Sequence, residues 1–190
     1  MSRLSILILT VVFSFFCFCT LTSLAASETN APANRVMDAD DYVATGAMKF
    51  IGWVGKFHPP VTHFPIALII AALVAEILFA WTGRTLFDNA RQYCLWFGII
   101  AAVGTGTLGW FFAGFHLIDD NWLLTTHRWL GTSTVTCSLI LAFLAWRVQY
   151  RNATVLRPWY RLVFLLAVIL VSATGFFGGA MLYGINEFAW

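Results

Sequence analysis

The segment His58-Pro59-Pro60-Val61-Thr62-His63-Phe64-Pro65-Ile66-Ala67-Leu68 leads into the first long apolar run that follows the N-terminal leader. Its adjacent prolines lack backbone N–H groups, so they are expected to interrupt a continuous helix. We expect Thr62 to cap a new helix, whose first turn tolerates Pro65 because those N–H groups have no intrahelical partner. The pattern therefore places His63 at the mouth of a helix and His58 just outside it.

The composition is that of a membrane protein. The chain has 190 residues, of which 60% are hydrophobic, 17% aromatic and 11% charged. Soluble proteins carry about 25% charged residues, so the main partner of this chain is the lipid bilayer. No run of basic residues supports nucleic-acid binding. The cysteine spacing indicates neither a disulfide framework nor a thiolate metal site.

The N-terminal part predicts export. Residues 1–26 have a basic start, an apolar centre and a small-residue cleavage region, which is typical of a cleaved signal peptide. An uncleaved anchoring helix is the alternative. Residues 27–57 then form a periplasmic lead-in. Within it, apolar residues recur at helical spacing from Asp40 to Phe57, which predicts a short amphipathic helix in the outer interface or a solvated connector.

Residues 58–190 are predicted to form one transmembrane domain. The apolar segments are Thr62–Trp81, Tyr93–Phe115, Trp129–Trp146 and Trp159–Tyr183. Each has about the 20 residues that cross roughly 30 Å of hydrocarbon as a helix. Tryptophans near the segment ends suit an aromatic belt. Short connections predict an all-α, antiparallel four-helix bundle, and no internal repeat is evident.

Charge sets the expected orientation. If the mature N-terminus is outside, segments 83–92 and 147–161 are cytoplasmic. These segments hold Arg84, Arg91, Arg147, Arg151, Arg157 and Arg161 against the single acid Asp88. The positive-inside rule therefore agrees with the signal peptide, and both termini are predicted on the periplasmic side.

This topology places all the histidines at the outer side of the membrane. They are His58, His63, His116 and His127. A helix bundle can hold haem between histidines of facing helices, and His63 with His116 or His127 is the preferred axial pair because these lie nearest helix ends. His58 is the less constrained candidate. Such a centre would serve the outer surface only.

Other uses of these histidines stay open. Copper or zinc would accept the same four imidazoles, with Asp119 or Asp120 completing or orienting the shell. Contacts with water, lipid headgroups or loop carbonyls are a second alternative, and proton handling is a third. The candidates for close approach to a flat cofactor, or for plain helix packing, are Gly104, Gly106, Gly109, Gly175, Gly178 and Gly179.

Glu76 is the one acid inside an apolar segment. It lies about 20 Å deeper than His63 at the helical rise, toward the cytoplasmic side. Ionisable groups in membrane helices indicate function. The alternatives are an ion pair with an inner arginine, such as Arg84 or Arg91, and a proton relay.

The opening segment resembles a bacterial membrane-protein family known as domain of unknown function 2231. Its H-x-x-x-x-H-F-P-I-A-L pattern matches residues 58–68, Glu76 matches an acid late in the first helix, and residues 178–184 resemble the closing pattern. After Gly184 the chain reads Ile-Asn-Glu, where the family often has His-Gly. The resemblance covers residues 56–186 and implies four helices. It implies no settled activity, although relatives that carry cytochrome c-like modules favour a redox role.

Two functions follow as hypotheses. The first is a haem b-, copper- or zinc-binding subunit of the bacterial inner membrane, which serves electron transfer with other membrane or cytochrome subunits. The second is a non-redox structural or assembly subunit of a membrane complex. No nucleophile–base pair indicates an autonomous enzyme.

Overall fold

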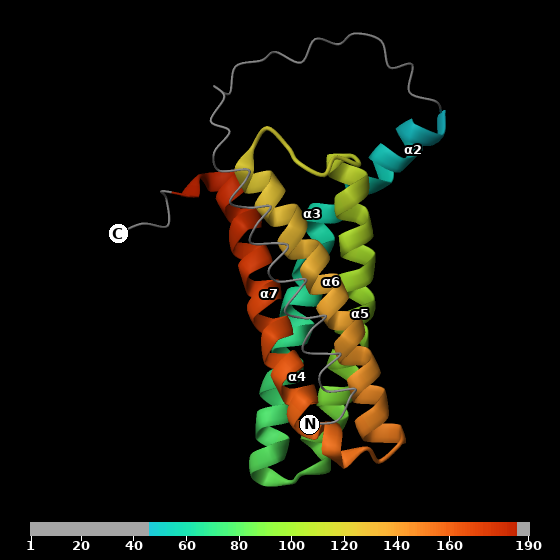
Figure 1. Ribbon diagram of the computed structural model, residues 1–190, viewed down its shortest axis with the longest axis vertical. Helices are drawn as coiled ribbons and strands as arrows, with labels where there is room; N and C mark the ends of the chain where they lie inside the picture. Colours follow the sequence, from blue (N-terminus) through green and yellow to red (C-terminus); the bar gives the residue numbers. More distant parts are fainter. Residues whose placement is uncertain (1–45, 186–190) are drawn as a thin grey trace.

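A computed structural model describes residues 46–185 of the chain, and these residues are helical, with no strand among them. The helices are α2 (Gly46–Gly55), α3 (His58–Val61), α4 (His63–Thr82), α5 (Thr85–Ala113), α6 (Trp122–Tyr150), the 3₁₀ turn η1 (Thr154–Leu156) and α7 (Arg157–Tyr183). Four candidate spans, built around α4, α5, α6 and α7, are long and apolar enough to cross a membrane (Figure 1). The signal-peptide region and the first part of the predicted amphipathic helix lie outside the described residues.

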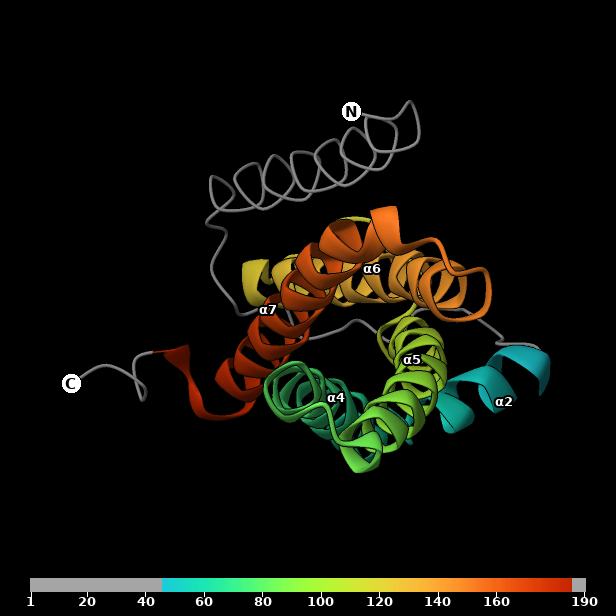
Figure 2. The same cartoon turned by 90° about the horizontal axis from the view of Figure 1, so that it is seen from below.

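The long helices form an antiparallel ring. Seen end-on, α4 lies beside α5, α5 beside α6, α6 beside α7, and α7 beside α4 (Figure 2). One end of the bundle carries α3 and the connection from α5 to α6, and we call it the histidine end. The other carries the connections from α4 to α5 and from α6 to α7, and we call it the arginine end (Figure 1).

The entry to α4 differs from the expected interruption. His58–Val61 forms a short helical turn, because its prolines occupy the first positions, where no intrahelical N–H is needed. The prediction that Thr62 caps α4 is wrong. Thr62 has helical backbone angles, and its hydroxyl donates 2.7 Å to the carbonyl of Pro59. His58 is therefore held in a helical turn instead of a loop.

The second and third membrane helices begin earlier than hydropathy predicts. The helix α5 begins at Thr85, two residues after Gly83, which ends α4 in the left-handed conformation with φ 65°. The helix α6 begins at Trp122, because Asn121 caps it by accepting a hydrogen bond of 2.9 Å from the backbone N–H of Leu123. These additional turns are polar or aromatic and extend beyond the most apolar segments.

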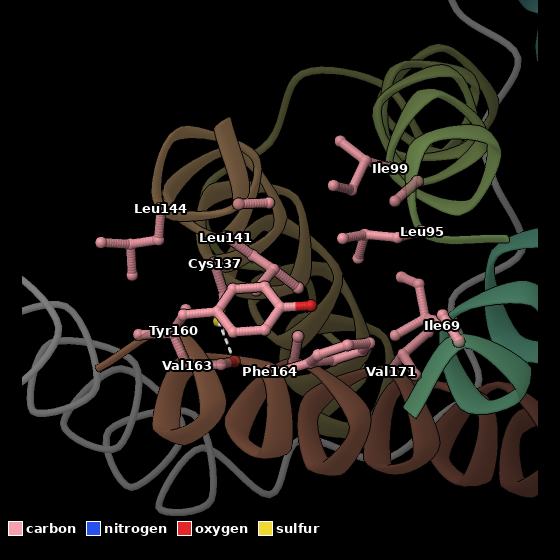
Figure 3. Close-up of a cluster of buried hydrophobic side chains, with 14 of the residues drawn as sticks. Ile69, Leu95, Ile99, Cys137, Leu141, Leu144, Tyr160, Val163, Phe164 and Val171 are labelled. Carbon is pink, nitrogen blue, oxygen red and sulfur yellow. Dashed lines mark hydrogen bonds between the residues drawn. The ribbon is translucent and has the colours of Figure 1, made fainter. Parts of the chain in front are cut away.

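An apolar core fills the bundle between the histidine pair described below and the arginine end. Fully buried side chains from all four long helices meet there, including Ile69, Leu95, Leu141 and Phe164 (Figure 3). In the same figure the thiol of Cys137 points to the carbonyl of Val163, at 3.6 Å. Apolar burial thus separates the two polar ends of the molecule.

Candidate functional site

Two histidines from distant parts of the chain meet inside the histidine end. The imidazole centroids of His58, at the start of α3, and His127, in the second turn of α6, lie 6.0 Å apart with an interplanar angle of 76°. Both side chains are partly buried. The structure thus pairs His58 and His127, whereas the sequence favoured His63 in the pair.

Each imidazole is held by a carbonyl of the neighbouring helix. Nδ1 of His58 lies 3.0 Å from the carbonyl oxygen of Thr105 in α5, and Nδ1 of His127 lies 3.0 Å from that of Thr174 in α7. A carbonyl can only accept, so each Nδ1 carries the hydrogen, and in the neutral imidazole Nε2 then keeps a lone pair. This is the tautomer of a metal-binding histidine whose other nitrogen is held by the protein.

A glycine one helical turn after each acceptor threonine makes room for the imidazole. A methyl group at Gly109 would lie 3.0 Å from Cε1 of His58, and one at Gly178 would lie 3.2 Å from Cε1 of His127. Contacts this short exclude a side chain unless the ring moves. The two glycines therefore let the imidazoles lie against the backbones of α5 and α7.

Threonine hydroxyls lie next to the pair. Thr134 and Thr174 share a hydrogen bond of 3.1 Å between their hydroxyl oxygens. Thr105 is 7% exposed, and its buried hydroxyl has no hydrogen-bond partner within residues 46–185. A buried hydroxyl without a partner is unfavourable in an otherwise satisfied interior.

Arg128 fixes the loop above the pair. Its guanidinium donates to both carboxylate oxygens of Asp119, at 2.9 and 3.0 Å, and to the carbonyls of Gly114 and Ala113 at the end of α5. It also lies 4.7 Å from the centroid of the Trp110 ring. This buried ion pair ties the end of α5 to the start of α6 beside His127. Sequence reasoning missed Arg128, although it directly follows a candidate histidine.

The other predicted histidines lie at the same end of the bundle but outside the pair. His63 is exposed on the first turn of α4, and His116 is exposed in the connection that follows Ala113, so it does not end a helix. Asp120 is exposed in the same connection. Within the described part of the chain, no group of three or more histidine, cysteine or acidic side chains is arranged to hold a metal ion.

Glu76 belongs to a charge cluster at the arginine end. Its carboxylate oxygens lie 3.3 Å from Nε of Arg91 and 3.1 Å from Nε of Arg161, so it forms the ion pair that the sequence offered as one alternative. Arg91 is 6% exposed, pairs with Asp88 as well, and donates 2.9 Å to the hydroxyl of Tyr160. The cluster joins α4, α5 and α7 at the arginine end of the apolar core.

The fold and the site together define a polytopic four-helix membrane protein with a pair of inward-facing imidazoles near one end. A family model described as "Predicted membrane protein (DUF2231)" matches residues 56–186, and the chain belongs to this family. Comparison with curated proteins and with solved structures gave no match.

Proposed function

We propose that the protein is a haem b-binding membrane subunit in which His58 and His127 would hold the iron. The observation that carries this proposal is the pairing of two imidazoles, each with Nδ1 held by a backbone carbonyl, at a centroid separation of 6.0 Å. Holding Nδ1 in this way leaves Nε2 as the ligand and fixes the ring orientation.

The centroid separation is short enough for both imidazoles to hold one metal. A bond of about 2.0–2.1 Å from a metal to an imidazole nitrogen puts the ring centroid roughly 3 Å from the metal, so two such rings would have centroids at most roughly 6 Å apart. The two Nδ1 contacts hold the ring planes at 76° to each other, and two imidazoles on one metal need not be parallel.

The donor set favours haem over a bare ion. The pair offers two nitrogens, and no third histidine, cysteine or acid within residues 46–185 joins them in a metal-binding group. Zinc sites take four ligands, or three and a water, from such groups. A porphyrin supplies the remaining ligands itself, so two imidazoles complete the shell of its iron.

When bound, haem supplies one-electron chemistry. The chain's own contribution is to hold the two imidazoles, to bury them partly next to the apolar core, and to place the site at the histidine end. The arginine end carries exposed Arg84, Arg151 and Arg157, so the positive-inside rule supports a periplasmic position for the histidine end. Electron transfer with an outer partner is then the role we propose.

The same orientation supports an interfacial role for α2. Its exposed aromatic residues Phe50 and Trp53 are three positions apart, and Trp53 contacts Phe50 as well as the exposed Phe57, which follows the helix. The helix extends sideways from α5 at the histidine end (Figure 2). Such a surface suits the boundary between headgroups and acyl chains. Labelling of single cysteines at positions 52 and 83 from the periplasmic side tests the orientation, and only the first is expected to react.

The test of haem binding compares four alanine variants of the full chain, purified in mild detergent after expression with haem available. We expect His58→Ala and His127→Ala each to reduce the haem content and Soret absorbance at least tenfold. His63→Ala and His116→Ala are matched controls with exposed rings, and they should keep both. The proposal is wrong if the wild type holds no haem, or if the control variants lose as much as the paired ones. Copper bound in place of haem would also overturn it.

A further inference from the structure

The contacts of His58 and His127 with backbone carbonyls occur at equivalent positions in two halves of the domain. The nitrogen–carbonyl pairs His58–Thr105 and His127–Thr174 both span 47 positions of the chain, and both measure 3.0 Å. In each half of the domain, a histidine near the start of a hairpin bonds to the second helix of that hairpin. The offset between the halves is 69 positions, which is also the separation of Arg91 and Tyr160.

The same offset relates the small residues around the site. The acceptor threonines open two Thr-Gly-x-x-Gly segments, residues 105–109 and 174–178. The last glycine of each segment contacts the histidine of its own half. A methyl group at Gly106 would lie 2.5 Å from Val135, and one at Gly175 would lie 3.1 Å from Ile66.

These last two contacts cross between the halves in a reciprocal way. Gly106 and Gly175 are equivalent under the offset, and so are Ile66 and Val135. Gly106 of the first half thus faces Val135 of the second half, while Gly175 of the second half faces Ile66 of the first half. Reciprocal contacts of this kind are the signature of a two-fold axis.

Burial follows the offset along the helices. The buried residues of α4 are Pro65, Ile69, Ala72, Ala75 and Glu76, and their equivalents in α6, all buried, are Thr134, Ser138, Leu141, Leu144 and Ala145. The helices α4 and α6 therefore turn equivalent positions toward the core. The pattern survives although the side chains differ in size and polarity.

Residues on a two-fold axis contact their own equivalents. His58 and His127 do so at the histidine end, and Arg91 and Tyr160 do so at the arginine end, where the guanidinium donates to the phenol. The axis therefore runs along the bundle from one pair to the other. Parallel repeats related by an axis along the membrane normal are a known architecture of membrane proteins.

We infer that the domain is a fused pair of equivalent hairpins, α3–α4–α5 and α6–α7, and that the imidazole pair is a duplicated half-site. Gly109 and Gly178 are its equivalent positioning residues. The ligand that the site takes lies on the internal axis and offers the two histidines equivalent coordination positions. This statement about the ligand rests on the proposed function, and the planar iron macrocycle meets it because its two faces are alike.

One departure from the symmetry concerns the hydroxyls of Thr105 and Thr174. In the second half, Thr134 supplies the partner of the Thr174 hydroxyl. The equivalent of Thr134 in the first half is Pro65, which has no hydroxyl. One of the two partners of the Thr174 hydroxyl thus has no counterpart in the first half, where the Thr105 hydroxyl has no partner in the described structure.

The test uses the full chain in detergent without haem, labelled with ¹⁵N in histidine. We expect the rings of His58 and His127 to show the same tautomer, with hydrogen on Nδ1. Gly109→Ala should shift the resonances of His58 more than those of His127, and Gly178→Ala should do the reverse. Gly104→Ala is the control, because a methyl group there meets nothing within 4 Å. Different tautomers for the two rings, or a control shift as large as the others, would overturn the inference.

A cross-linking experiment covers the case in which a glycine variant does not fold. Cysteine pairs at positions 106 and 135 and at positions 66 and 175, in a chain with Cys94 and Cys137 replaced by serine, should both form disulfides. A β-carbon at position 106 would lie 3.8 Å from that of Val135, within the range of a disulfide. Failure of both pairs would contradict the two-fold arrangement. Equivalent imidazoles in a chain that takes up no haem would instead overturn the proposed function alone.

Discussion

Removing the hydroxyl of Thr105 should stabilise the protein, whereas the same change at its equivalent, Thr174, should destabilise it. Valine has nearly the shape of threonine, so each substitution removes a hydroxyl and little volume. The buried Thr105 hydroxyl has no partner within residues 46–185, while that of Thr174 bonds to Thr134 and to the carbonyl of Leu170.

The magnitudes follow from the cost of unpaired polar groups. An unsatisfied buried hydroxyl costs about 1–3 kcal/mol, so Thr105→Val should raise the free energy of unfolding by about 1 kcal/mol. Hydrogen bonds between membrane helices contribute about 0.6 kcal/mol on average. Thr174→Val should therefore lower the free energy of unfolding by about 0.5–1 kcal/mol, because Thr134 can then donate its single hydroxyl hydrogen to the carbonyl of Leu130.

Thermal unfolding of the haem-free protein in detergent, followed by circular dichroism, measures these effects. A change of 1 kcal/mol corresponds to about 2–4 °C in Tm for a chain of this size. Thr107→Val is the control, since Thr107 is exposed on the same helix and should change Tm little. A fall in Tm for Thr105→Val as large as that for Thr174→Val would refute the reasoning, because it would mean that the Thr105 hydroxyl has a favourable partner.

Two further predictions concern the charged groups. Glu76→Gln should lower the free energy of unfolding by about 3 kcal/mol, since it leaves the charge of the buried Arg91 with less compensation. Arg161→Gln should lower it by less than about 1 kcal/mol, because the side chain of Arg161 is half exposed. Equal losses for the two variants in thermal melts would contradict the assigned partners. Beside the proposed haem, Asp119→Asn should raise the midpoint potential because Arg128 keeps an uncompensated positive charge, and Arg128→Gln should lower it because Asp119 remains negative. Redox titration of the two variants measures both shifts, and shifts of the same sign would show that the ion pair acts only through the structure of the loop.

The sequence was sufficient for the spans and for the gathering of the histidines at one end of the bundle. Length and hydropathy identify four helices because the bilayer sets both quantities. Helix ends were less predictable. The turns from Thr85 and from Trp122 are too polar to score as membrane segments, yet a left-handed glycine and an asparagine cap fix where these helices begin.

The pairing of the histidines was not predictable, for a physical reason. Which imidazoles meet depends on the rotation of each helix about its axis, and core packing between helices sets that rotation. The double proline before Val61 indicated a break, so His58 was considered the least constrained histidine. The prolines instead occupy the first turn of α3 and hold His58 against α5. The repeat was hidden for a similar reason, because the halves share a burial pattern more than they share residues.

The most direct measurement of the central claim is the electron paramagnetic resonance spectrum of the oxidised wild-type protein, purified with its native content of haem. Two neutral imidazoles from His58 and His127 predict a low-spin ferric signal of bis-histidine type, which is lost when either residue is replaced by alanine because those variants hold little haem. A protein without any haem signal would contradict the account, and so would a low-spin signal that survives in both alanine variants.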